Sequence, residues 1–216
     1  MRGERSRRDP VVQTGGMGLA RFLFQPRILL LLVLGYVPYV VAGHFLFYFL
    51  PIFGQRLGMS GTAVSQLFLV NGVCVLLFTR LAAEVFLKRM DHGWAARWAL
   101  LLLGAGFLLF SWMQSIAGVL LSVVVLSLAN SFGHSAMNLC FSEEALRRGF
   151  GGGRAMGAFS LFENLGETAG PVVFGFLLAG DVAGGFRVLA LVYGACAALF
   201  FLPGGRRGYR GRHLST

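Results

Sequence analysis

Two carboxylic acids lie four residues apart in an otherwise apolar part of the sequence. Glu163 and Glu167 are spaced so that both fall on one face of a helix. Ser160, Asn164, Thr168 and Pro171 share that face, within an arc of about 140°. An ionisable side chain in hydrocarbon costs roughly 2.5 to 3.5 kcal/mol, so this face must meet protein or water. We expect a water-filled cavity in which the two glutamates exchange protons and Ser160 and Asn164 contact a solute.

A second polar stripe precedes the first along the chain. His134 lies in it between Asn130 and Asn138, with Ser127, Ser131 and Ser135 on the same face. Because histidine titrates near neutral pH and pairs with carboxylates, His134 is expected to join the proton coupling. Asn130 and Asn138 are expected to bind solute. The alternative is that these side chains, protonated glutamates included, only form hydrogen bonds between helices.

A third set of polar side chains lies in the first apolar run, where Tyr39 and His44 are further candidates for solute contact. Aromatic residues near a membrane surface are also common as interfacial anchors, so both interpretations remain open. We predict no catalytic residues and no enzyme, because the chain has no GxSxG or HExxH motif. The three cysteines form no CxxC pair, and no metal site or cofactor is expected.

The elements that position these residues are predicted to be transmembrane helices. The sequence is 56% hydrophobic and 13% charged, against about 25% charged residues in soluble domains. A helix needs about 20 apolar residues to cross a bilayer, so the 45 residues from Trp98 to Ser142 without Lys, Arg, Asp or Glu must hold two helices. Gln114-Ser115 marks the turn between them. The expected spans are 28–53, 62–79, 98–113, 116–141, 155–179 and 186–202.

The basic residues predict the orientation of this all-α, polytopic membrane protein. With six spans, 17 of the 19 Lys and Arg residues fall on the side of both termini. By the positive-inside rule that side is the cytoplasm, and the chain belongs in a cytoplasmic (inner) membrane. The predicted domains are a basic cytoplasmic segment, 1–27, a transmembrane domain, 28–203, and a basic cytoplasmic tail, 204–216. Because the basic residues gather between apolar runs, the expected partner is the lipid bilayer and not nucleic acid.

The chain resembles one six-helix half of a major facilitator superfamily transporter. The loop after the second span contains Arg80 and Glu84, followed by Lys88 and Arg89. It matches the acid and the bases of the family's loop motif but lacks its glycine. The sequence from Gly157 through Gly166, Gly170 and Pro171 is similar to the antiporter motif of the family's fifth helix, with Phe174 in place of a further glycine. These departures favour the C-terminal half, helices seven to twelve.

The resemblance implies secondary transport of a small solute by alternating access, with proton-coupled antiport as one form of it. A conformational gate would then include Arg80, Glu84, Lys88, Arg89, Gly166, Gly170 and Pro171. It also implies a second six-helix half, either missing from this chain or supplied by another copy. The alternative function is a non-transporting sensor or anchor module of a larger signalling protein.

Overall fold

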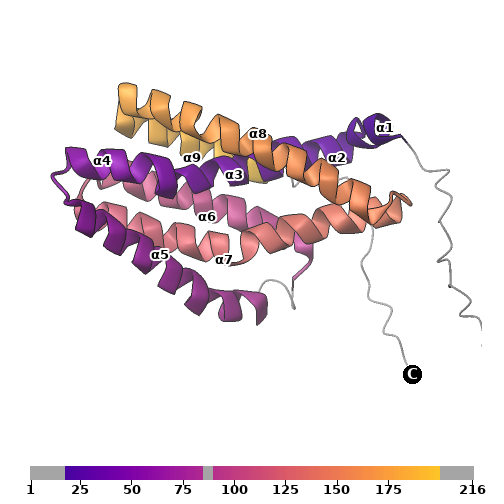
Figure 1. Cartoon of the computed structure of the whole chain (residues 1–216), viewed down its shortest axis with the longest axis horizontal. Helices are drawn as coiled ribbons and strands as arrows, with labels where there is room; N and C mark the ends of the chain where they lie inside the picture. The colour runs from indigo at the N-terminus through magenta and orange to yellow at the C-terminus, as the bar shows by residue number, and fades with distance from the viewer. Residues whose placement is uncertain (1–17, 85–89, 200–216) are drawn as a thin grey trace, which may run out of the picture.

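The computed structural model describes residues 18–84 and 90–199, and within these ranges the chain contains helices and no strand. A short helix, α1 (Leu19–Leu23), comes before six long ones (Figure 1). The first long helix runs from Pro26 to Arg56. The others are α5 (Gly61–Ala82), α6 (His92–Trp112), α7 (Ile116–Arg147), α8 (Gly152–Ala179) and α9 (Val182–Leu199).

The first long helix changes its pitch twice along its length. Its segments are α2 (Pro26–Leu30), the π-helix η1 (Leu31–Tyr36), α3 (Val37–His44), the π-helix η2 (Phe45–Phe49) and α4 (Leu50–Arg56). Each π segment ends two residues before a proline, Pro38 or Pro51. Proline cannot donate a hydrogen bond to the carbonyl four residues earlier, and its ring collides with that carbonyl, so the helix widens there. Single-turn π segments are frequent at functional sites.

The helix boundaries follow local signals in the sequence. Gly58 adopts a positive φ of 75° in the turn between α4 and α5. Ser60 caps α5 by accepting a hydrogen bond from the Ala63 amide at 3.2 Å, and Ser115 caps α7 by accepting one from the Gly118 amide at 3.3 Å. The predicted break at Gln114-Ser115 is therefore confirmed.

Five helices are long and apolar enough to cross a membrane: Pro26–Arg56, α5, α6, α7 and α9. The predicted all-α class is confirmed, and the five apolar helices are typical of an integral membrane protein. Helix α8 has 28 residues but is not among the five, and its Glu163, Asn164 and Glu167 lower its apolar character. The predicted segments 1–27 and 204–216 lie mostly or wholly outside the described residues.

Helix α6 packs between α7 and α9, α5 packs on α7, and α8 packs on α3. In Figure 1, α8 lies along the first long helix and α5 lies at the opposite edge of the bundle. Helix α5 is the least enclosed of the five apolar helices, because only 11% of its most apolar 18-residue segment is buried. Its polar contact with the bundle is a 2.8 Å hydrogen bond from the Ser127 hydroxyl to Asn71.

Two clusters of aromatic rings form much of the core. At one end of the bundle, Phe22 stacks on Phe150 at 4.0 Å between ring centroids, and Phe141 lies 5.3 Å from Phe159. At the other end the rings of six buried phenylalanines meet, with centroid distances down to 4.6 Å: Phe45, Phe49, Phe107, Phe110, Phe174 and Phe186. Between the two clusters, near the middle of the long helices, lie most of the predicted polar site residues.

Candidate functional site

Two glycines bring α8 into close contact with α3. A Cβ atom at Gly166 would lie 2.7 Å from the Cβ of Val40, and a Cβ at Gly170 would lie 2.3 Å from the His44 ring. Gly166 and Gly170 form a GxxxG sequence, whose missing side chains let the two helices approach closely. Because the two glycines face α3, the neighbouring polar positions of α8 lie on the flank of this interface.

The centre of the candidate site is Tyr36, the last residue of η1. Its ring stacks on Phe159 of α8 at 3.8 Å between centroids and lies 6.0 Å from the ring of His134 on α7. The Glu163 carboxylate interacts electrostatically with the Tyr36 hydroxyl, and Glu167 does so more weakly. The structure thus brings the predicted proton-coupling residues of α7 and α8 around one tyrosine of the first helix.

The Tyr36 hydroxyl lacks a hydrogen-bond partner among the described residues, although Tyr36 is fully buried. Glu163 is the carboxylate that affects it most, through its charge and through a side-chain hydrogen-bond interaction that falls outside standard hydrogen-bonding geometry. Buried polar atoms in proteins are almost always satisfied by protein or by water. A water molecule or a polar ligand between Tyr36 and Glu163 would satisfy both groups.

The polar stripes of α7 and α8 are largely open to the surroundings. On α8, Glu163 is half-buried, whereas Ser160, Asn164, Glu167 and Thr168 are exposed. On α7, His134 and Ser135 are exposed, and Asn130, Ser131 and Asn138 are half-buried. We call these ten side chains, together with Tyr36, the polar face. Helix α8 also exposes Leu161, Leu165, Val172 and Phe176 on a separate stripe, so its surface is divided into polar and apolar halves.

The remaining predicted solute-binding residues have mainly structural contacts. Tyr39 is 8% exposed, and its ring lies so close to α7 that a Cβ at Gly133 would be 2.5 Å from it. His44 is half-buried under Gly170, and its Nδ1 lies 3.4 Å from the Val40 carbonyl. Asn138 accepts a 3.2 Å hydrogen bond from Ser142. Their solute-binding role stays a prediction.

The predicted gate is described only in part. Arg80 and Glu84 are exposed at the end of α5, and Lys88 and Arg89 lie outside the described residues. Pro171 lies inside α8, one residue after the Gly170 contact, where it removes one backbone hydrogen bond. The role of these residues in gating stays a prediction.

Tyr36 lies in the same apolar run as Tyr39 and His44, but it is not among the residues predicted to bind solute or exchange protons. It shares a broad arc of the first helix with Tyr39 and His44, but its neighbours come from α7 and α8, which spacing within one helix does not show. The signal that could have found it is Pro38, which follows two residues later and accompanies the π segment that ends at Tyr36.

The described residues contain no group of three or more His, Cys, Asp and Glu side chains that could hold a metal ion. A scan against models of protein families finds no match, and a search of curated proteins finds none. The class that the fold defines is thus a helical bundle with five helices able to span a membrane, and with a polar face on α7 and α8.

Proposed function

We propose that this chain is one six-helix unit of a secondary transporter of the major facilitator type, located in a cytoplasmic membrane with both termini inside. The observation that carries the proposal is the grouping of Glu163 and His134 around the buried side chain of Tyr36, whose hydroxyl has no hydrogen bond of standard geometry in the described residues. Ionisable residues within membrane-spanning helices mark ion and substrate pathways. The grouping lies near the middle of the helices, the depth at which transporters bind their substrates.

In the proposed mechanism the polar face forms half of a solute cavity. A second six-helix unit, from another chain segment or from a second copy, covers it, because exposed Glu167 and His134 are poorly suited to lipid. Solute contacts Asn164, Asn130 and Asn138. Glu163 exchanges a proton with one side of the membrane at a time.

Proton exchange couples to transport through the free energies of the two conformations. Protonating Glu163 removes a charge, which changes the stability of the inward-facing state relative to the outward-facing state. Pro171 and the two π segments supply weak points at which the helices can bend. The close contact of Gly166 and Gly170 with α3 makes α8 and the first helix move together.

The proposal is tested with the chain in proteoliposomes that enclose a pH-sensitive dye. A sugar, a dipeptide, an organic amine and a cationic drug are added outside, one at a time. We expect one class to change the internal pH, and liposomes without protein to show no change. If folded protein moves no protons with any of the four classes, the coupling proposal fails and the sensor or anchor function gains support.

A further inference from the structure

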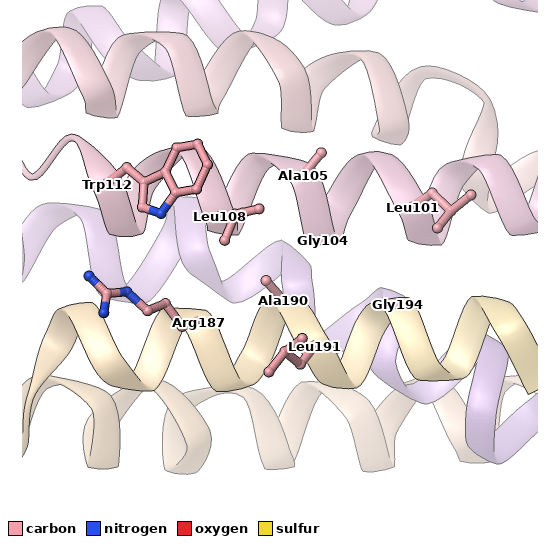
Figure 2. A pocket seen from close by; sticks show the side chains of 9 residues that line it. All are labelled: Leu101, Gly104, Ala105, Leu108, Trp112, Arg187, Ala190, Leu191 and Gly194. Carbon is pink, nitrogen blue, oxygen red and sulfur yellow. The ribbon is translucent and has the colours of Figure 1, made fainter.

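A hollow of about 400 Å³ lies between α6 and α9, and it includes none of the predicted site residues. Leu101, Gly104, Ala105 and Leu108 line it from α6, and Ala190, Leu191 and Gly194 line it from α9 (Figure 2). Gly194 leaves space in it, because a Cβ there would meet nothing within 4 Å, whereas Gly104 brings α6 close to α9, since a Cβ there would lie 3.2 Å from the Tyr193 Cβ. We call this hollow the α6–α9 groove.

One end of the groove differs from the rest because it carries a cation and an indole. Arg187 and Trp112 lie together there, whereas Leu101 and Gly194 lie at the other end (Figure 2). Trp112 is 70% exposed, and tryptophan in such a position is typical of the membrane–water interface. The groove therefore runs from an interfacial end into the apolar zone.

The Arg187 guanidinium has hydrogen-bonding capacity that the described protein leaves unused. Its Nε donates to the Ser111 hydroxyl at 3.2 Å, and that hydroxyl donates to the Ala183 carbonyl at 2.9 Å. These contacts hold the guanidinium at the mouth of the groove. Its two Nη groups have no acceptor in the described part of the chain, and no ion pair involves Arg187 there. Two adjacent Nη donors match the oxygens of a phosphate.

The length of the groove matches one leaflet of a bilayer. Leu101 and Trp112 are separated by 11 residues of α6, which at 1.5 Å per residue is about 16 Å. Half of a hydrocarbon core of about 30 Å is about 15 Å. An acyl chain that lies along the groove therefore places its headgroup beside Arg187 and Trp112.

We propose that the α6–α9 groove binds an anionic phospholipid, with one acyl chain along the groove and the phosphate on the Arg187 Nη groups. A second copy seated on the same groove about a two-fold axis would bring two Arg187 guanidinium groups together, which disfavours that occupant. The inference requires the bundle to be in a bilayer but does not depend on transport. By the predicted topology, the lipid belongs to the outer leaflet.

The test uses quenching of tryptophan fluorescence by lipids with brominated acyl chains. The chain is reconstituted with brominated phosphatidylglycerol or brominated phosphatidylcholine at equal mole fraction. The contribution of Trp112 is the difference between the protein and its Trp112→Phe variant. We expect the Trp112 signal to show that phosphatidylglycerol binds the groove about fivefold more strongly than phosphatidylcholine, as one basic residue near an anionic lipid implies.

Variants separate the two parts of the site. Arg187→Gln should remove the preference, and Arg187→Lys should retain part of it. Gly194→Leu fills the groove and should reduce quenching by both lipids, whereas Val192→Leu, at an exposed position of α9 outside the groove, should not. Equal quenching by both lipids, or a preference that survives in Arg187→Gln, overturns the proposal. The proposal is also overturned if Trp112 is protected from both lipids and the protection is lost when the protein is diluted in lipid. That result would mean that a second copy covers the groove at high protein density.

Discussion

Gly170→Ala is expected to lower the melting temperature of the purified protein, whereas Gly175→Ala is expected to leave it unchanged or raise it. The added methyl group at position 170 would lie 2.3 Å from the His44 ring and 2.9 Å from the His44 Cβ. Either the ring or the whole of α8 must move. Overpacking of this kind costs about 1 to 3 kcal/mol.

Gly175 is a matched control because it lies on the same helix. A Cβ there would meet only the Tyr48 hydroxyl at 3.8 Å. An alanine in a helix interior is more favourable than glycine by up to about 1 kcal/mol. The two variants therefore have opposite expected signs, and thermal unfolding in one detergent measures both.

A rescue variant identifies the contact. Gly170→Ala combined with His44→Ala should recover part of the lost stability, since it removes the ring that the new methyl group meets but keeps the Cβ of residue 44 at 2.9 Å. If Gly170→Ala is as stable as Gly175→Ala, then α8 does not pack against α3 as described.

Glu163→Gln is expected to abolish the accumulation of solute that a pH gradient drives. Glutamine has the size of glutamate but cannot exchange a proton. Exchange of one proton per solute across a gradient of one pH unit supplies about 1.4 kcal/mol, which supports about a tenfold concentration ratio at steady state. We expect about this ratio for the protein and a ratio near one for the variant.

Glu167→Gln is expected to have a smaller effect, because Glu167 is exposed and interacts more weakly with Tyr36. Asp181→Asn is the matched control, since it removes a carboxylate from the exposed turn between α8 and α9. Uptake of the solute identified in proteoliposomes gives the ratio for each variant. Gradient-driven accumulation at the original level in both glutamate variants would exclude them from coupling.

The sequence predicts the helices well because their ends are marked by strong local signals. Long runs without formal charge fix the interiors, and Gly58, Ser60 and Ser115 fix three of the boundaries. The two acids that define the candidate site also make α8 less apolar than its neighbours. One pair of residues thus supports the site prediction and weakens the prediction of a sixth span.

Contacts between helices are harder to predict from periodicity. A helical wheel separates the polar and apolar stripes of α8, but it does not show that a third stripe, with Gly166 and Gly170, faces α3. It also cannot show that Tyr36 lies between α7 and α8, because that position depends on how three separate helices pack. The hydrogen bond from Ser127 to Asn71 could not be predicted for the same reason.

The central claim is that the polar face borders water within the membrane, and cysteine accessibility tests it directly. The native Cys74, Cys140 and Cys196 are first replaced by alanine. Asn164→Cys then places a thiol on the polar face, and Leu165→Cys places one at nearly the same depth on the apolar stripe, where Leu165 is 57% exposed. A membrane-impermeant maleimide is added to intact membranes.

Maleimide reacts with the thiolate, which forms only where water reaches the sulfur. We predict that the Asn164→Cys variant is labelled at least about tenfold faster than the Leu165→Cys variant, as expected of a thiol in water compared with one in lipid. Equally slow labelling of the two variants would mean that lipid or protein covers both positions, and it would contradict a water-filled cavity at Glu163.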